Sequence, residues 1–313
     1  MKRRVFVTLL LLTALMLEMR GQWDVQFSDY TALKSFYNPA VSGTDGKLNA
    51  AAAYSMQMTG YDKAPTTLYI GVDMPVYFLN PHHGAGLSFY NDNIDIFTTT
   101  RIGLQYAYNI KLSKKGKLAI GVQGAFLNTK MASRGMTLEE NNDPAFSSSE
   151  AKGNKVDMGV GLYYYHPRLW VGASSQHLLD PMIVMDKRYE VKVPRMYYLM
   201  GGCNIKLRNS LLSLQPSFLV QSDMTSWRED VQCKATYENN EKKFFGGLGY
   251  SPNTSVTLLI GGMFHGVNFG YSYQMYTSGL GVVHGSHELV VGYLTDLDLF
   301  KKGRNKHQSV RWL

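Results

Sequence analysis

The amino-acid sequence predicts an all-β protein, a closed antiparallel transmembrane β-barrel of about 14 strands with its N- and C-termini in the periplasm. Three observations predict this fold: an export leader, a composition rich in glycine and tyrosine, and repeated segments in which apolar and polar residues alternate. Only 18% of the residues are charged, while Gly (30) and Tyr (21) are abundant. An exported chain of this composition favours a barrel over a soluble enzyme.

The chain begins with a predicted signal peptide, residues 1–21. Basic residues at positions 2–4 precede the apolar run VFVTLLLLTALML, which is short for a membrane span. Because the small residue Gly21 follows this run, we expect cleavage before Gln22. An uncleaved anchor is the alternative, since the glutamate and methionine at 18–19 are unusual near a cleavage site. In both cases the chain leaves the cytoplasm.

The predicted barrel, residues 47–298, is made of alternating runs. In the segment 100–112 the even-numbered residues from Ile102 to Leu112 are apolar, and the odd-numbered residues from Arg101 to Lys111 are polar or small. A strand points alternate side chains to opposite faces, so this segment is predicted to have a lipid face and a lumen face. A tilted strand needs roughly 9–11 residues to cross a bilayer, which most of the runs provide. The runs begin near Lys47, Thr66, His83, Thr100, Lys117, Asn154, Arg168, Val193, Leu211, Arg228, Lys242, Ser255, Val267 and Ser286.

The need to pair the sheet edges favours closure, and the lengths of the connections favour one orientation. Closing the sheet removes its unpaired edges, and an even number of strands brings both ends of the barrel to one side. The two longest connections, 130–153 and 178–192, both follow odd-numbered strands, which predicts that they lie at the cell surface. Short connections, predicted to be periplasmic turns, follow even-numbered strands at 113–116, 166–167, 208–210 and 239–241.

The segment 22–46 precedes the barrel and is predicted to lie in the periplasm or in the lumen. Barrels of 16–18 strands leave an aqueous channel, and eight-stranded barrels are filled by side chains. Fourteen strands enclose a lumen of intermediate width, which this segment can partly occupy.

The C-terminal tail, residues 299–313, is basic. It could bind anionic lipid or an acidic partner, or it could be a solvated end. Its cations are Lys301, Lys302, Arg304, Lys306 and Arg311, and it has no acidic residue. The loop 130–153 has the opposite character, and it either faces a surface partner or has none. Its acidic residues include Glu139, Glu140, Asp143 and Glu150.

The two cysteines, Cys203 and Cys233, fall in phase with the lipid-facing residues of the eighth and tenth strands. A ninth strand separates them, so we expect both to be free.

Catalytic and metal-binding patterns are weak. His82 and His83 are adjacent, so they cannot easily face one metal from a strand. In the segment GSHE, Ser286 and Glu288 share one strand face while His287 points to the other, which disfavours a nucleophilic triad. We expect His287 and Glu288 in polar contacts at the barrel rim, and we expect no cofactor or metal.

Paired glycines, at 201–202, 246–247 and 261–262, do not form a phosphate loop, because no strand–turn–helix context and no GK[ST] accompanies them. In a barrel wall, glycine permits bends and close packing against whatever fills the lumen.

Several segments, in the same order along the chain, resemble the PorP/SprF family of outer-membrane proteins. The pattern Gln26-Phe27-Ser28, then Asn38-Pro39-Ala40 and Gly43, is similar to the opening of that family. The likeness continues in residues 64–75, around Pro65, and in LQYAYNIKL, LQPSFLVQS, NFGYSYQMYTSGL, GSHELVVGY and SVRWL. Trp23 and the run Met56-Gln57-Met58 depart from the pattern, which leaves the partner of this member open. Asn38, Pro39, Gly43, Pro65, His287 and Glu288 are the candidate structural residues of the motif.

The resemblance implies a non-enzymatic component of the type IX secretion system, in some bacteria linked to gliding. It implies as partners outer-membrane lipid, periplasmic ring proteins, a peptidoglycan-associated lipoprotein and exported surface proteins, but no nucleic acid. Because the lumen is too narrow for a folded protein, we expect an anchor or docking element and not the conduit. A general or substrate-selective porin is the alternative. A barrel enzyme acting on lipid is a third hypothesis, disfavoured because no nucleophile and base converge.

Overall fold

The computed structural model describes residues 24–76, 82–132, 151–185, 189–208, 211–239, 242–277 and 284–296. The predicted signal peptide, the basic tail 299–313 and the acidic loop residues at 133–150 lie outside these residues, so what was expected of them stays a prediction. Within the described ranges, no helix is long and apolar enough to cross a membrane.

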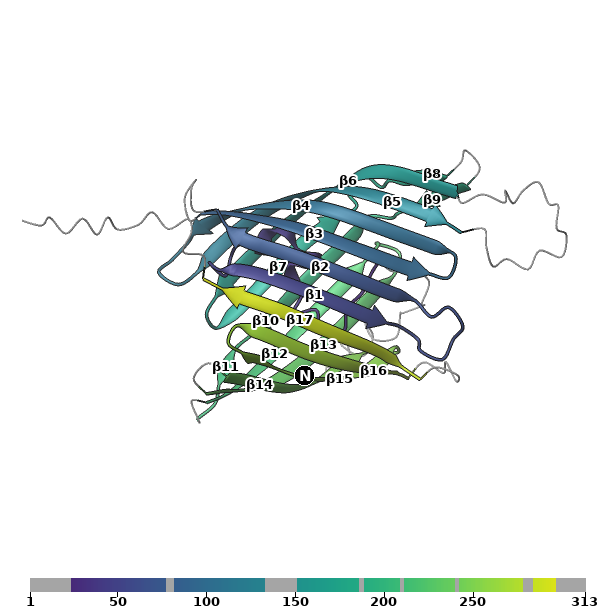
Figure 1. Cartoon of the computed structure of the whole chain (residues 1–313). Coiled ribbons are helices and arrows are strands. Elements are labelled where there is room, and N and C mark those ends of the chain that lie inside the picture. The colour runs from purple at the N-terminus through teal and green to yellow at the C-terminus, as the bar shows by residue number, and fades with distance from the viewer. Residues whose placement is uncertain are drawn as a thin grey trace, which may run out of the picture.

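Fourteen described strands form a closed antiparallel barrel, which confirms the predicted fold (Figure 1). Neighbours in sequence are neighbours in the wall, and the pairing of β1 with β17 and of β10 with β12 closes the sheet on itself. The wall strands are β1 Leu48–Met56, β2 Thr66–Pro75, β3 His83–Ile94, β4 Phe97–Lys111, β5 Lys117–Met131, β6 Ala151–His166, β7 Leu169–Gln176, β10 Met196–Cys203, β12 Leu212–Ser222, β13 Trp227–Asn239, β14 Lys242–Ser251, β15 Ser255–Phe264, β16 Val267–Tyr276 and β17 Ser286–Thr295.

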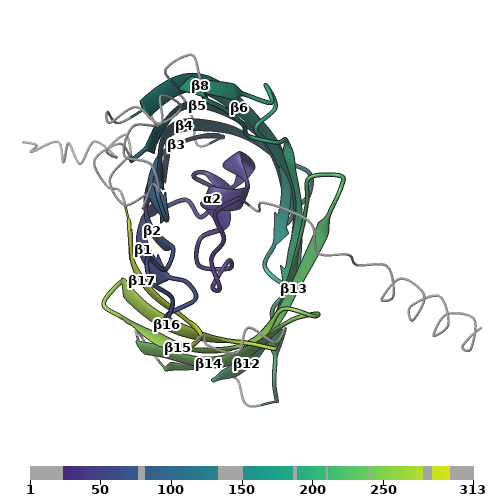
Figure 2. The ribbon, with the colours of Figure 1, turned by 90° about the vertical axis from the view of Figure 1, so that its right-hand side faces the viewer.

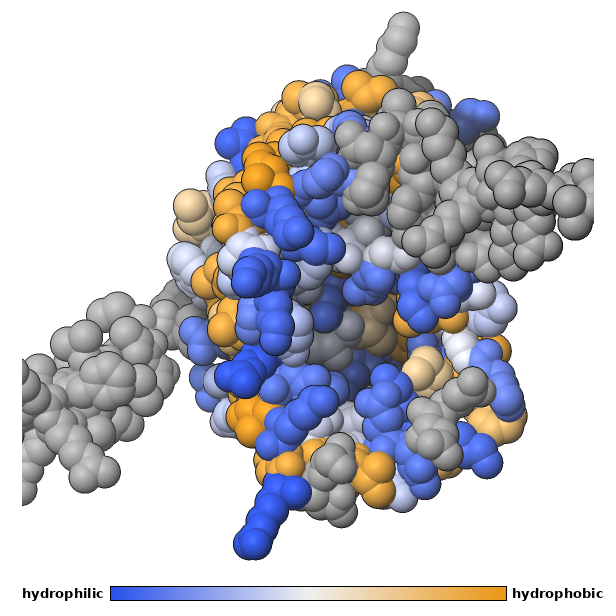
Figure 3. Space-filling model, turned by 90° about the vertical axis from the view of Figure 1, so that its left-hand side faces the viewer, coloured by the Kyte–Doolittle hydropathy of each residue, from blue (hydrophilic) through white to orange (hydrophobic). Residues whose placement is uncertain are grey.

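The two faces of the wall differ as the alternation predicted. In β4, Arg101 and Gln105 are 3% and 5% exposed, whereas Leu104 between them is 68% exposed. A soluble protein rarely exposes a continuous apolar band of this kind, so the outer face is suited to lipid. Figure 3 shows this from one end: hydrophobic residues appear on the outer flanks and hydrophilic ones gather around the mouth.

The barrel has two different ends, named here by their connections. At the short-turn end, β4 and β5 are joined by a tight turn in which Leu112 N donates to Gly116 O at 3.1 Å, and β6 and β7 are separated by two residues. The connections from β5 to β6 and from β7 to β10 lie at the opposite, long-loop end (Figure 1).

One predicted loop contains a hairpin. Within 178–192, β8 (Met182–Met185) pairs with β9 (Tyr189–Lys192). The hairpin forms because the alternation of β8 buries Ile183 and Met185 against Leu127 of the wall. A further short strand, β11 (Ile205–Lys206), continues beside β12 after β10 ends.

Residues 24–46, called here the N-terminal plug, lie inside the barrel (Figure 2). The plug contains one turn of helix, α2 (Lys34–Tyr37), and a 3-10 turn, η1 (Pro39–Val41). Tyr37 and Ala40 are fully buried although they belong to short elements, because the barrel wall surrounds them. Among the described residues, the largest hydrophobic cluster is therefore formed between plug and wall.

Both cysteines are free, as predicted. Cys233 is exposed on the wall and Cys203 is partly buried at the end of β10.

Candidate functional site

The plug runs lengthwise through the lumen. Its first described residue, Asp24, contacts residues at the long-loop end, where β7 ends and β10 begins. Its last turn, around Gly43, packs against the start of β3 at the short-turn end. The start of β1 and the end of β17 share one end of the barrel, as predicted. Asp24 lies toward the other end, because the plug runs the length of the lumen before β1 begins.

Aromatic rings fix the middle of the plug. Phe36 contacts Tyr69 of β2 edge-on at a centroid distance of 5.3 Å, and Tyr37 contacts Tyr198 of β10 at 5.5 Å. Phe27 packs edge-on against Phe36 at 5.1 Å. Each such ring buries a large apolar area and adds about 0.5–1.5 kcal/mol through ring geometry. The plug is therefore packed as a core and does not lie loosely in a pore.

Charged side chains hold the plug at the long-loop end. His177 Nε2 lies 3.2 Å from Asp24 Oδ2, and His177 Nδ1 lies 2.8 Å from Asp157 Oδ2. Arg101 Nη2 lies 3.9 Å from the same Asp157 oxygen, and the Tyr198 hydroxyl donates to Asp24 Oδ2 at 2.8 Å. Since Arg101, Asp157 and His177 are at most 3% exposed, each of these charges depends on the others for stabilisation.

His177 carries a charge at neutral pH. Burial lowers the pKa of its imidazole, but the charge of Asp24 and the contact with Asp157 outweigh burial and raise the pKa to about 9. Burial also raises the pKa of the Asp24 carboxyl, but His177 outweighs this effect and lowers it to about 2. The contact between plug and wall is therefore an ion pair throughout the neutral range.

Raising the pH is expected to loosen this end of the plug. Because the folded-state pKa of His177 is raised from 6.5 to about 9, its stabilisation is fully present below pH 6.5 and is lost as the pH rises through 9. The charged groups that face the ring are Asp24, Asp157 and Arg101. The thermal unfolding temperature of the refolded barrel should fall across this window. His177→Gln should remove most of the fall, and an unchanged pH dependence in that variant would contradict the assignment.

Glu288 binds the plug backbone near the same end. Its two carboxylate oxygens accept the amides of Ser28 at 2.6 Å and Asp29 at 2.9 Å. The polar contacts expected for Glu288 near the start of β17 are present, but they are made inside the lumen, where Glu288 is only 2% exposed. His287 points to the outer face, where its Nδ1 lies 2.7 Å from the Tyr271 hydroxyl.

A second ion pair fixes the next residue of the plug. Lys234 Nζ, from β13, lies 2.6 Å and 2.7 Å from the two carboxylate oxygens of Asp29 and 2.8 Å from Thr31 Oγ1. The sequence contained no signal for this pair beyond the lumen parity of Lys234, because the partners are 205 residues apart.

The motif residues Asn38 and Gly43 attach the plug to the wall, and Pro39 opens the turn between them. Asn38 Nδ2 donates to Leu162 O at 2.9 Å, and its Oδ1 accepts Ala40 N at 2.9 Å. Gly43 has a φ of 72° and donates its amide to Asp73 Oδ1 at 2.8 Å. Pro65 lies outside the plug, and its carbonyl accepts Gln57 N at 2.8 Å at the long-loop end.

Glycines of the wall give the plug its room, but they are not the paired glycines singled out from the sequence. A Cβ on Gly161 would lie 2.0 Å from Asn38 Oδ1, and one on Gly121 would lie 2.2 Å from Ala40 N. By contrast, a Cβ on Gly201 or Gly261 would first meet a wall phenylalanine or wall backbone, and Gly246 faces open space. The paired glycines therefore did not identify the contacts with the plug; single glycines whose strand position faces the lumen make them.

Two of the cavities formed by the described residues lie along the plug, one toward each end of the barrel. The cavity at the long-loop end has a volume of about 260 Å³ and is lined by the first plug residues, Gln57 and Pro65. The cavity at the short-turn end has a volume of about 430 Å³ and is lined by Asp29, Lys34 and Lys234.

The histidine motifs form no catalytic arrangement in the described chain. Ser286 Oγ lies 2.6 Å from the Tyr276 hydroxyl, while His287 lies on the opposite face of β17. His83 Nδ1 is engaged with the Tyr106 hydroxyl at 2.6 Å on the outer face. Among the described residues, no three or more His, Cys, Asp or Glu side chains are placed to hold a metal ion.

Comparisons with known proteins agree with the barrel. A family model described as "Type IX secretion system membrane protein PorP/SprF" matches residues 19–293. No curated protein matches the sequence. The structure is similar to the CymD monoaromatic hydrocarbon channel, at 11% identity and a TM-score of 0.50, over 85% of this chain and 93% of that chain. It is also similar to the Pseudomonas putida toluene transporter TodX, at 9% identity and a TM-score of 0.49, over 88% of this chain and 95% of that chain. At these identities, the likeness to CymD shows the fold alone.

Proposed function

We propose that this chain, which belongs to the PorP/SprF family of type IX secretion system membrane proteins, is an outer-membrane anchor or docking element of that system and not the conduit for exported proteins. The observation that carries the proposal is the plug. A conduit needs a continuous lumen, whereas here a covalently attached segment fills the middle of the barrel with packed rings and buried ion pairs.

The width of the barrel supports the same proposal. Fourteen strands enclose a lumen between the side-chain-filled interior of eight-stranded barrels and the open channel of 16–18-stranded porins. Even without the plug, such a lumen is too narrow for a folded protein. Exported proteins would then cross the membrane elsewhere, and this barrel would position other components.

The proposed orientation places the short-turn end in the periplasm. Short periplasmic turns and longer surface loops are typical of outer-membrane barrels. In this orientation the basic tail 299–313 would lie in the periplasm, beyond β17, and could contact periplasmic ring proteins or a peptidoglycan-associated lipoprotein. The loop 133–150 would face the cell surface and exported proteins. If removal of 301–313 left assembly and secretion intact while the barrel still inserted, the role of the tail would be lost.

Deletion of the gene tests the function. We expect many exported proteins to accumulate in the periplasm, as measured by proteomics of medium, surface and periplasm, and the restored gene to reverse the change. Loss of a single surface protein would indicate a helper dedicated to that cargo. Unchanged protein location together with slower uptake of small solutes would contradict the proposal and favour a porin.

A further inference from the structure

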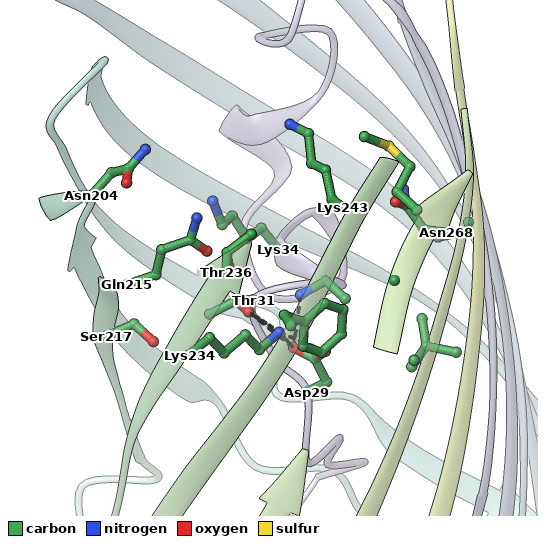
Figure 4. A pocket seen from close by; sticks show the side chains of 18 of the residues that line it. Asp29, Thr31, Lys34, Asn204, Gln215, Ser217, Lys234, Thr236, Lys243 and Asn268 are labelled. Atoms are coloured by element: carbon green, nitrogen blue, oxygen red, sulfur yellow. Dashed lines mark hydrogen bonds and ion pairs between the residues drawn. The ribbon is translucent and has the colours of Figure 1, made fainter. Parts of the chain in front are cut away.

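The cavity at the short-turn end, called here the basic cavity, lies between the plug and one side of the wall (Figure 4). Figure 3, which looks at this end, shows the mouth hollowed. Its lining includes Asn49, Lys243 and Asn268, each the second residue of a strand that starts at the short-turn end. The cavity is therefore reached from that end, and its volume of about 430 Å³ is in the range of ligand sites.

The lining has more positive than negative charge. Three lysines, Lys34, Lys234 and Lys243, line the cavity against one carboxylate, that of Asp29. The Asp29 carboxylate is already bound by Lys234. Lys243 Nζ lies 2.9 Å from Glu238, but both side chains are well exposed, so water and salt weaken that pair.

Lys34 is the lining lysine for which the described residues supply no ion-pair partner. Its ammonium lies 4.1 Å above the centre of the Trp170 ring, a cation–π contact that fixes its position. Within the described ranges, no carboxylate lies within ion-pair distance of it. Burial lowers the pKa of Lys34; the charge of Asp45 opposes this effect, and the charge of Lys234 adds to it. An anion in the cavity would supply the missing partner.

The rest of the lining is suited to a peptide. Neutral amide and hydroxyl side chains, which both donate and accept hydrogen bonds, surround the lysines. The lysine ammonium groups act as point charges for an anion, while the neutral side chains can pair with the N–H and C=O groups of a peptide backbone, which a simple anion lacks. These neutral residues are Asn49, Asn204, Gln215, Thr236 and Asn268.

We infer that the basic cavity binds a short acidic peptide segment of a partner protein, with a carboxylate against Lys34 and the peptide groups against the neutral side chains. That the segment belongs to a periplasmic partner rests on the proposed docking function. The inference that the cavity binds an acidic peptide rests on its lining residues and does not depend on that function.

A binding measurement on the purified full-length barrel tests the inference. The probe is a fluorescently labelled peptide of alternating glutamate and glycine, compared with the same peptide carrying glutamine. We expect the acidic peptide to bind at least tenfold more tightly, and Lys34→Gln to weaken its binding roughly tenfold, as loss of a charged partner implies. Added salt should weaken binding in the unchanged protein and have less effect in Lys34→Gln.

Lys63→Gln is the matched control, because it removes the same charge at the long-loop end, where Lys63 is exposed and lies 3.1 Å from Asp95. It should leave the affinity unchanged. Asn268→Leu, which fills the cavity from the opposite wall, should weaken binding if Lys34→Gln fails to fold. Equal affinity for both peptides, or an effect of Lys63→Gln equal to that of Lys34→Gln, would overturn the inference. Binding of inorganic phosphate without peptide binding would also overturn it.

The outcome is separable from that of the gene deletion. Loss of secretion on deletion, with no peptide binding, would remove the cavity proposal and leave the docking function. Peptide binding with unchanged protein location would leave the cavity proposal and remove the docking function.

Discussion

Removing most of the plug, residues 25–41, is expected to convert a barrel with little stable current into an open channel. The deletion takes away the rings of Phe27, Phe36 and Tyr37 and exposes the polar lumen face of the wall. In planar bilayers the deleted form should show steps comparable with those of an open porin, while the full-length protein stays near the baseline. Stable current of similar size in both would contradict a sealed lumen.

Insertion of the deleted barrel has to be checked by its heat-modifiable migration on gels. If it does not insert, Phe36→Asp tests the same point, because it places a charge among aromatic rings where Phe36 is 3% exposed. The partly displaced plug should then produce current that fluctuates and does not stay constant.

Gly121→Val is expected to expel the plug turn around η1 from the wall. The new Cβ would lie 2.2 Å from Ala40 N and 2.4 Å from Ala40 Cα, so backbone would have to move. Overpacking of this kind typically costs about 1–3 kcal/mol, and we expect the upper part of this range or more, because backbone cannot yield as a flexible side chain can. The free energy of unfolding in urea should fall accordingly.

Gly124→Val on the same strand is the control. Gly124 lies on the outer face of β5, where a Cβ would meet nothing within 4 Å. The substitution is the same, so strand propensity and side-chain size are matched. An equal loss of stability in both variants would show that the plug does not set the cost at Gly121.

The wall could be predicted from the sequence because its signal is local. Alternation with a period of two is imposed by the backbone of a strand, so Arg101 and Leu104 could be assigned to opposite faces without knowledge of any partner. The lengths of the connections then indicated which connections lie at the same end of the barrel. The hairpin of β8 and β9 was missed because each of its strands is only four residues long.

The interior could not be predicted to the same depth because its partners are far apart in the chain. The Asp24–His177 contact joins residues 153 positions apart, and Ser28 meets Glu288 across 260. Lumen parity marks Arg101, Lys234 and Glu288 as polar groups that need partners, but it does not say which. The pairing of Arg101 with Asp157 requires the register of distant wall strands, and the pairing of Lys234 and of Glu288 requires the path of the plug, neither of which any periodicity encodes.

The docking function requires the plug to be a permanent part of the barrel, and a disulfide between plug and wall tests whether it is. A Cβ on Gly161 would lie 3.0 Å from Asn38 Cγ, close to the spacing between a Cβ and the opposite sulfur of a disulfide. Asn38→Cys with Gly161→Cys, in a chain whose two native cysteines are replaced by alanine, should therefore lock the plug on oxidation.

The measurement is the secretion of type IX cargo by cells whose only copy is this locked variant, with and without reductant. The single variants serve as controls for the loss of the Asn38 and Gly161 contacts. If the barrel is a docking element, secretion should be equal whether the disulfide is formed or reduced. Secretion that stops when the bond forms and resumes when it is reduced would show that the lumen must open, and would contradict the account.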